Sequence, residues 1–378
     1  MDDLIYLDHN ATTPVLPEVL EDMLPYFSSD FGNAASHTNR FGRQAHVKVD
    51  DSLNSIAQFL SCDSSELVIT SGATESINLA IKGVFEKYTS KGKHFITCVT
   101  EHKAVIDTFK AIEKKGAEVD YLGVDANGLI DLMELQSKLR SDTVMVSIML
   151  ANNETGVIQK MPSIAKLVHD NDSIMMSDIT QAFGKMIINF DDLGIDLATF
   201  SAHKFYGPKG IGGLFVRRKN PRVVLEEQIN GGGHQKVRRS GTINVAGLVG
   251  MSSAINHINE DVNTNSRLVK DAFEQLLNEQ IDVKIIGSES DRLLNTSMVM
   301  FLGVKAERLI TKCPDLNMAM GSACTSASRE PSHVLKAMGL SDEESAWCIR
   351  FSFGRLNYLG QVKEIVQSLV KGIQAVQN

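Results

Sequence analysis

Residues 197–210 read Leu197-Ala198-Thr199-Phe200-Ser201-Ala202-His203-Lys204-Phe205-Tyr206-Gly207-Pro208-Lys209-Gly210, an apolar run followed by a turn rich in glycine and proline. The apolar run predicts a β-strand, and four similar runs precede it with helical patterns between them: 66–69, 94–98, 143–148 and 173–176. Near-continuous apolar strands that alternate with helices are typical of a mostly parallel sheet covered on both faces. The sequence therefore predicts an α/β fold.

The pattern changes after about residue 255. The elements expected here are a long helix, two strands and a closing helix: 265–279, 283–286, 297–301 and 361–376. They are typical of a smaller α+β domain, on which we expect the N-terminal arm to pack. We therefore predict a large domain of residues 15–255 and a small, discontinuous domain of residues 1–14 and 256–378.

The composition narrows the class of protein. The chain has 378 residues, of which 43% are hydrophobic and 22% charged, as in a globular protein, and no stretch reaches the roughly 20 apolar residues of a membrane span. The acidic start Met1-Asp2-Asp3-Leu4 lacks the pattern of a secretory signal, so we expect a cytoplasmic protein. A net charge of −8 argues against direct binding to nucleic acid. Five cysteines without CxxC spacing argue against a disulfide framework and a metal site.

Lys204 follows the predicted strand 197–200 directly, between a histidine and a turn. An amine at the end of a strand can condense with an aldehyde cofactor, and ligands gather at the carboxyl ends of strands in such sheets. The alternative is a solvated surface charge or a phosphate contact.

Other polar residues follow predicted strands as well. The run Ser71–Ser76 opens a helix and would cradle a phosphate, or it is a plain helix cap. Asp178 would keep a pyridine nitrogen protonated and Gln181 would donate to a ring hydroxyl, or both belong to a helix cap. His102 would stack on a flat cofactor and exchange protons, or it is structural. Asn153 would bind a ring oxygen or a substrate carboxylate, or it forms a turn.

Cys324 lies in the run Gly321–Ser328, whose residues are small and polar. Such a run suits an exposed loop that carries a thiolate nucleophile, although a lone cysteine is often a buried small hydrophobe. We expect that second, structural state for Cys62, Cys98 and Cys348, and leave Cys313 undecided.

Over nearly its whole length the chain resembles the cysteine desulfurases of the NifS and IscS type, which are class V, fold-type I pyridoxal-phosphate enzymes. The runs that carry this resemblance are Tyr6–Asp8, Asn10–Pro14, Phe31–Asn33, Ser71–Ser76, Glu101-His102, Asn152–Glu154, Asp178 with Gln181, Ser201–Gly210, Gly231–His234, Arg239–Thr242, Gly321–Ser328, Glu330–His333 and Arg350–Ser352. The form of the run around Cys324 is similar to that of group I of the family. The sequence departs from the family's usual residues at Ala34, Ile77 and Thr155.

The resemblance implies a fold-type I transferase with a seven-stranded sheet in its large domain. It also implies a homodimer with shared active sites that binds pyridoxal 5'-phosphate. Lys204 would form the Schiff base and Cys324 would be the nucleophile, while His102 would stack on the ring and take part in catalysis. The other implied cofactor contacts are Ala73, Thr74, Asn153, Asp178, Gln181, Ser201, His203 and, from the neighbouring subunit, Thr242. Arg350 would anchor the substrate carboxylate, helped by Asn153 and Asn33.

The implied reaction removes sulfur from L-cysteine and yields L-alanine and a persulfide on Cys324. An acceptor protein would then take the sulfur for iron–sulfur cluster assembly, tRNA thiolation or DNA phosphorothioation. The alternatives are another fold-type I enzyme, such as a selenocysteine lyase or an aminotransferase, or a scaffold of a sulfur pathway without catalysis.

Overall fold

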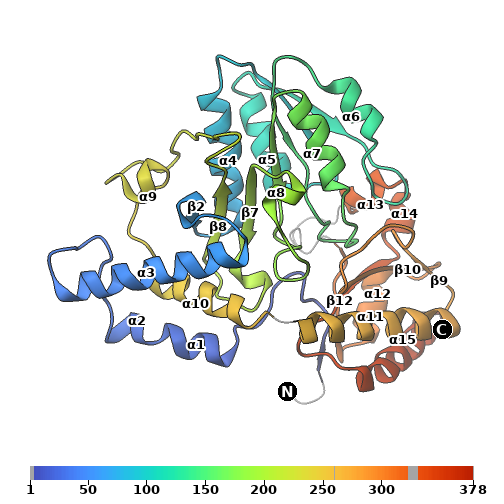
Figure 1. The fold of residues 1–378 in the computed structure, drawn as a ribbon. Helices are drawn as coiled ribbons and strands as arrows, with labels where there is room; N and C mark the ends of the chain where they lie inside the picture. The colour runs from blue at the N-terminus through green and yellow to red at the C-terminus, as the bar shows by residue number, and fades with distance from the viewer. Residues whose placement is uncertain (1–3, 259, 322–330, 378) are drawn as a thin grey trace.

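The computed structural model describes residues 4–258, 260–321 and 331–377. Its largest element is a seven-stranded sheet in the order β2-β8-β7-β6-β5-β3-β4 (Figure 1). Strand β8 runs antiparallel to both of its neighbours, and the other neighbouring pairs are parallel. The strands are β2 (Leu67–Thr70), β3 (His94–Cys98), β4 (Glu118–Leu122), β5 (Thr143–Ser147), β6 (Ile174–Asp178), β7 (Leu197–Ser201) and β8 (Gly212–Val216). The predicted fold class, α/β with a mostly parallel seven-stranded sheet, is confirmed.

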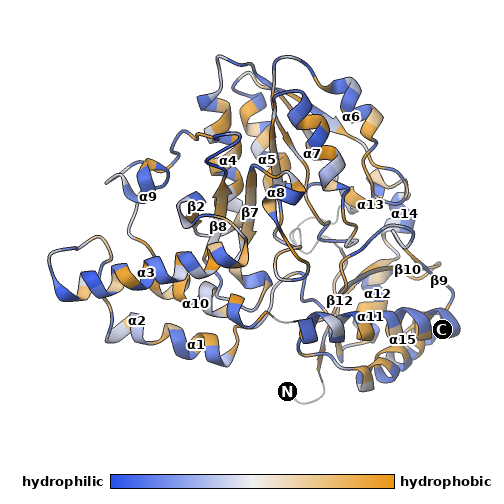
Figure 2. Cartoon of the chain, in the orientation of Figure 1, coloured by the Kyte–Doolittle hydropathy of each residue, from blue (hydrophilic) through white to orange (hydrophobic). Residues whose placement is uncertain are grey.

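Helices cover both faces of this sheet because its strands alternate apolar residues between two cores. In β2, Val68 belongs to one core cluster, while Leu67 and Ile69 belong to the other. Helices α4 (Ala73–Lys87) and α5 (Lys103–Glu113) complete the first cluster. The second contains α3 (Arg40–Phe59), α7 (Met161–Asp170) and α10 (Val245–Asn256). Figure 2 shows β7 and β8 as mainly hydrophobic, as strands buried on both faces should be.

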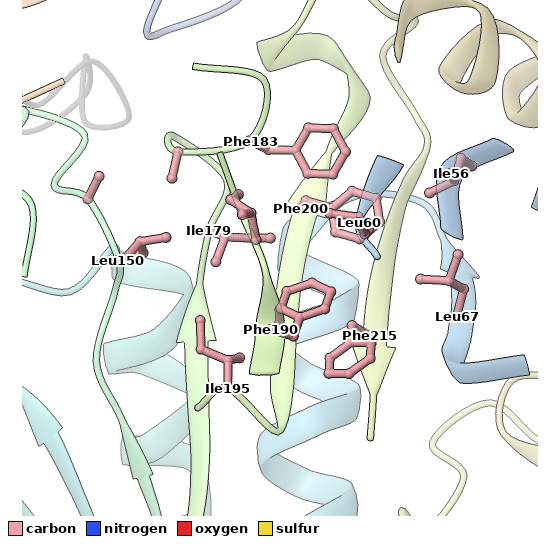
Figure 3. Packing of buried hydrophobic residues seen from close by; sticks show 14 of the residues in the cluster. Ile56, Leu60, Leu67, Leu150, Ile179, Phe183, Phe190, Ile195, Phe200 and Phe215 are labelled. Atoms are coloured by element: carbon pink, nitrogen blue, oxygen red, sulfur yellow. The ribbon is translucent and has the colours of Figure 1, made fainter. Parts of the chain in front are cut away.

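Aromatic rings pack beneath the turn that carries Lys204. The ring of Phe183 stacks on those of Phe200 and Phe205, with centroid distances of 4.7 and 4.4 Å. Phe190 and Phe215 stack at 4.0 Å on the same side of the sheet (Figure 3). Because Phe200 and Phe205 flank residues 201–204, this packing fixes the end of β7 and the turn that follows it.

The C-terminal part forms a second, smaller layer around a three-stranded antiparallel sheet in the order β12-β10-β9. Its elements are β9 (Val283–Ile285), β10 (Thr296–Phe301), β12 (Cys348–Ser352), α11 (Glu260–Gln280), α12 (Ala306–Lys312) and α15 (Val362–Gln377). The N-terminal strand β1 (Ile5–Tyr6) pairs with β11 (Leu316–Asn317), and Ile5 and Leu7 enter the core of this part. These contacts agree with the predicted small domain of residues 1–14 and 256–378. The division of the chain into two domains stays a prediction.

The remaining helices are short. They are α1 (Pro17–Met23), α2 (Pro25–Ser28), α6 (Leu132–Lys138), α8 (Phe190–Leu193), α9 (His234–Val237), α13 (His333–Ala337), α14 (Asp342–Ser345) and the 3-10 turns η1 (Ser64–Glu66), η2 (Ala202–Lys204) and η4 (Leu359–Gln361). Across residues 4–258, 260–321 and 331–377, no helix has the length and apolar character needed to cross a membrane.

Candidate active site

A cavity of about 580 Å³ lies where the carboxyl ends of β2, β3, β5, β6 and β7 meet. Most of the residues predicted for the site line it: Ala73, Thr74, His102, Asn153, Asp178, Gln181, Ser201, His203, Lys204 and Arg350. Such volumes suit small ligands, and the carboxyl edge of the sheet is where ligands bind in this fold class. The structure therefore brings together side chains that are up to 277 positions apart in the sequence, from residue 73 to residue 350.

Lys204 ends the turn η2 and reaches back to the N-terminal arm. Its Nζ donates hydrogen bonds to the main-chain carbonyls of Asn10, at 2.6 Å, and Ala11, at 2.8 Å. The amine is therefore held at the wall of the cavity by carbonyl oxygens. No role was predicted for Asn10, although it lies in the run Asn10–Pro14, which is one of those that resemble the cysteine desulfurases.

The N-terminus of α4 also lines the cavity. The N-cap residue is Gly72 at φ +152°, and no side chain caps the helix there, so the predicted alternative of a side-chain cap by Ser71 or Thr74 is wrong. A 15-residue helix therefore presents its first N–H groups and positive dipole end to the cavity. A Cβ at Gly72 would lie 3.5 Å from Ser201 Oγ, so that hydroxyl adjoins the same turn. This arrangement suits an anionic group.

Two further side chains set the charge of this end. Glu75 accepts from Ser71 N at 2.7 Å and forms an ion pair with Arg239 at 2.8 Å, so its negative charge is offset. His203 bonds Thr12 Oγ1 through Nδ1 at 3.1 Å. Burial, with help from Lys204 and Lys209, lowers the pKa of His203 to about 4. The ring is therefore neutral at pH 7.

Asp178 ends β6 and is buried. Its Oδ1 accepts from Thr180 N at 2.9 Å and from Thr199 Oγ1 at 3.3 Å. The first bond closes a turn, and the next helix, α8, begins only at Phe190, so the predicted alternative of a cap on a following helix is wrong. The same bond fixes the carboxylate in the wall of the cavity. A buried, fixed carboxylate can pair with a protonated ring nitrogen.

His102 is the N-cap residue of α5, and its Nδ1 accepts from Ala104 N at 3.1 Å. If Nδ1 accepts this bond, the neutral ring carries its proton on Nε2. His102 also lines the cavity, so its role as a helix cap leaves the predicted contact with a cofactor possible in this geometry, and that contact stays a prediction. Its neighbour Glu101 is fully buried, and burial, followed by the charge of Asp178, raises its pKa well above the usual range. The protonated, neutral form of Glu101 is therefore favoured in the folded chain.

Arg350 lies on β12 and is 2% exposed. Its guanidinium donates to Asp8 Oδ1 at 2.7 Å, Asn153 O at 2.9 Å and Gly321 O at 3.2 Å. Among the described residues, Arg350 Nε and Asn153 Oδ1 are buried without a hydrogen-bond partner. Buried polar groups without partners are costly, and an acidic ligand would satisfy Arg350 Nε.

Asn33 and Thr242 lie apart from these residues. Both line a second cavity, of about 390 Å³, together with His234 and Arg238. The structure of a single chain therefore does not bring Asn33 or Thr242 into the cavity of Lys204.

The cysteines differ in their surroundings. Cys324 lies outside the described residues. Cys98, Cys313 and Cys348 are buried, and Cys62 is half-buried. Burial raises the pKa of Cys62, Cys98 and Cys348 to about 12, so these thiols are poor nucleophiles at pH 7. The expected structural state of Cys98 and Cys348 is confirmed, and Cys62 packs at the edge of the main core.

Residues 5–365 match the family model for Aminotransferase class-V, and the chain belongs to this family of pyridoxal-phosphate enzymes. A curated relative, the cysteine desulfurase IscS of Edwardsiella ictaluri (strain 93-146), is 46% identical over 374 residues, which are 98% of this chain and 92% of that protein. Among solved structures, a NifS-like protein has a TM-score of 0.90 and 31% identity, covering 98% of this chain and 100% of that one. SspA in complex with cysteine has a TM-score of 0.84 and 34% identity, and the match covers 92% of this chain and 98% of that one.

The cavity fits the cofactor of this family. It offers an amine at Lys204, a buried carboxylate at Asp178 and the N-terminus of α4 within one space. These groups match the aldehyde, the ring nitrogen and the phosphate of pyridoxal phosphate in chemical type.

Proposed function

We propose a role for each side chain of this cavity in the reaction of a cysteine desulfurase. The similarity to the curated cysteine desulfurases supplies the activity itself. One observation carries the proposal: Lys204, Asp178 and the N-terminus of α4 surround a cavity that Arg350 also lines. A cofactor-binding set and a carboxylate-binding arginine thus share one space. When bound, pyridoxal phosphate supplies an electron sink that allows a bond at the substrate's β-carbon to break.

The side chains then have distinct roles. Lys204 Nζ would hold the cofactor's aldehyde covalently and later move a proton at the substrate's α-carbon. Asp178 would keep the ring nitrogen protonated, and Gln181 would donate to the ring's oxygen. The first turn of α4, with Ala73, Thr74, Ser201 and His203, would bind the phosphate. Arg350 and Asn153 would bind the carboxylate of L-cysteine, and His102 would stack on the ring and exchange protons with the substrate.

Cys324 would attack the sulfur of the bound cysteine as a thiolate. This attack would form an S–S bond and break the bond between the substrate's β-carbon and sulfur. The electron pair of the broken bond would stay with the carbon skeleton, and a proton would complete L-alanine. The four other cysteines are buried or half-buried, which supports Cys324 as the nucleophile.

A homodimer with shared sites is part of this proposal. Large apolar side chains on α1, α2 and α3 and the loop between them are about half exposed or more: Leu20, Leu24, Phe27, Phe31, Phe41 and Val47. Asn33 lies among them in the sequence and, with Thr242, lines the second cavity. A second copy that covers this apolar surface would bring Thr242 and Asn33 to its partner's cofactor and substrate.

The product sulfur requires an acceptor protein, because a persulfide on the enzyme must be discharged before the next turnover. Iron–sulfur cluster assembly, tRNA thiolation and DNA phosphorothioation each supply such an acceptor. A cytoplasmic location stays a prediction of the sequence.

Trapping the cofactor tests the proposed site. Borohydride reduction of the protein loaded with pyridoxal phosphate, followed by peptide mapping, should place the cofactor on Lys204. Lys204→Ala should abolish alanine formation, whereas Cys324→Ala should still bind cofactor and cysteine. Cofactor trapped on another lysine, or wild-type cysteine turnover by Cys324→Ala, would overturn the assignment.

A further inference from the structure

Lys185 lies in the turn after β6, four residues beyond Gln181, and is partly buried. Its Nζ donates to Gln181 Oε1 at 2.9 Å and to Asn10 Oδ1 at 3.0 Å. Neither bond involves a carboxylate. The amine of Lys185 therefore donates to two side-chain amides beside the active site, those of Gln181 and Asn10.

The amide of Gln181 is fixed from both ends. Its Nε2 donates to the main-chain carbonyl of Asn10 at 2.9 Å, and its Oε1 accepts from Lys185. Turning the amide over would place Oε1 against a carbonyl oxygen and Nε2 against an N–H donor, and would lose both bonds. A primary amide carries two N–H groups, so the second one remains available to an acceptor in the cavity that Gln181 lines.

Asn10 connects the same network to Lys204. Its main-chain oxygen accepts from both Gln181 Nε2 and Lys204 Nζ, while its side-chain Oδ1 accepts from Lys185. The side-chain Nδ2 of Asn10 donates to Thr296 Oγ1 at 2.9 Å, so this amide also has a single satisfactory orientation. Lys185 therefore holds both amides that adjoin the reactive amine.

The surroundings of Lys185 disfavour its positive charge. Burial, together with the positive charges of Lys204 and Arg350, holds the pKa of Lys185 well below its usual range. The two hydrogen bonds from its amine to amide oxygens do not depend on that charge, because a neutral amine also has two N–H groups.

We propose that Lys185 is a positioning residue that locks the Gln181 amide with an N–H directed at the site. This inference rests on the proposed function, because the acceptor of that N–H is the oxygen on the cofactor's ring. A donor held in one orientation does not have to reorganise as the charge on its acceptor changes during the reaction.

A double-mutant cycle tests this role, with Lys185→Met and Gln181→Ala made singly and together in the full-length protein loaded with pyridoxal phosphate. Lys185→Met removes both N–H donors and keeps most of the side chain. We expect kcat to fall about tenfold, the scale of one lost hydrogen bond, and KM for cysteine to stay within about twofold because Arg350 is untouched. The visible absorption maximum of the bound cofactor should shift in the direction seen for Gln181→Ala.

The decisive result is the combined variant. If Lys185 acts through Gln181, the double variant is no slower than Gln181→Ala alone. A double variant that is a further tenfold slower than Gln181→Ala would overturn the role. So would a Lys185→Met protein whose cofactor absorption maximum stays where it is in the exposed control Lys363→Met. If Lys185→Met does not fold, Lys185→Gln takes its place in the cycle. Wild-type protein that binds no cofactor would refute the proposed function instead, so the two failures are distinguishable.

Discussion

At the scale of the residue, Arg350 is a large, fully buried side chain at the edge of the site. Its bonds to Asp8, Asn153 and Gly321 hold the guanidinium in place, and Nε has no partner among the described residues. Lysine keeps the charge but lacks the planar fork that binds a carboxylate through two bonds.

We therefore predict that Arg350→Lys raises KM for cysteine between about 10- and 100-fold, the range for a hydrogen bond to a charged group, while the bound cofactor's absorbance is retained. Steady-state kinetics with a cofactor titration checks this. The matched control is Arg217→Lys, a partly buried arginine paired with Asp196 away from the cavity. An Arg350→Lys enzyme with the wild-type KM would show that the carboxylate binds elsewhere.

Residue types and their positions after strands were enough to predict Lys204, Asp178, Gln181 and His102 as candidate site residues. Arg350 lies within β12 and was predicted from the family resemblance alone. Glu101 and Lys185 were not assigned roles, because their importance depends on burial and on partners distant in the sequence. Glu101 is an ordinary acid in the sequence, and its pKa is raised only because it is fully buried beside Asp178. Nothing in the sequence distinguishes Lys185 from the other lysines, because its hydrogen bond to Asn10 forms only in the folded chain.

At the scale of the element, the turn between β2 and α4 depends on glycine. Gly72 has φ +152°, a conformation that L residues with a side chain rarely adopt. In the facing strand, a Cβ at Gly212 would lie 2.7 Å from Gly72 Cα, so the two chains are close together.

Gly72→Ala should therefore destabilise the protein by about 1–2 kcal/mol and weaken binding of pyridoxal phosphate, because the first turn of α4 would shift. Thermal unfolding and titration of the apoprotein with cofactor measure the two effects. Gly123→Ala is the control, since a Cβ there meets nothing within 4 Å. Unchanged cofactor affinity in Gly72→Ala would argue against a phosphate site at this turn.

The predicted strands of the large sheet agree with β2, β3, β5, β6 and β7 to within two residues at each end. Strands β4 and β8 were missed for physical reasons. Strand β4 is a sheet edge that includes Glu118 and Asp120, so it lacks the apolar run of a central strand. Strand β8 begins with Gly212 and Gly213, where Phe200 leaves no room for a Cβ, and glycines usually weaken a strand prediction.

At the scale of the whole molecule, two neutral histidines tie the N-terminal arm to the rest of the chain. His9 Nδ1 bonds Ser352 O at 3.0 Å and His203 Nδ1 bonds Thr12 Oγ1 at 3.1 Å. Burial lowers the pKa of each from 6.5 to about 4. Between pH 4 and 6.5 each of these two histidines therefore binds more protons in the unfolded chain than in the folded one, and its contribution to stability rises with pH in this window.

The contribution of His9 to the free energy of unfolding should thus fall by up to about 3 kcal/mol on acidification from pH 6.5 to 4. Urea unfolding at several pH values measures the slope, and His9→Gln should flatten it. An equal slope in His9→Gln and wild type would show that His9 is not the neutral, buried group described above.

The proposed homodimer with shared active sites predicts how mixed dimers behave. Lys204→Ala and Thr242→Asp should each be inactive alone, the second because its carboxylate repels the cofactor's phosphate. In a mixed dimer, one site combines Lys204 of one subunit with Thr242 of the other. Refolding the two variants together should restore about a quarter of wild-type activity, since half of the dimers are mixed and one of their two sites is intact. If the refolded mixture is as inactive as either variant alone, the two subunits do not share their active sites.

The central claim is that sulfur from L-cysteine passes to Cys324 at the cavity of Lys204. The most direct measurement incubates the protein loaded with pyridoxal phosphate with L-cysteine, quantifies alanine, and maps persulfide by mass spectrometry before any reductant is added. We predict one alanine for each persulfide in the first turnover, with the persulfide on Cys324. Alanine with the persulfide on Cys62, Cys98, Cys313 or Cys348, or cofactor bound without any alanine, would contradict the account.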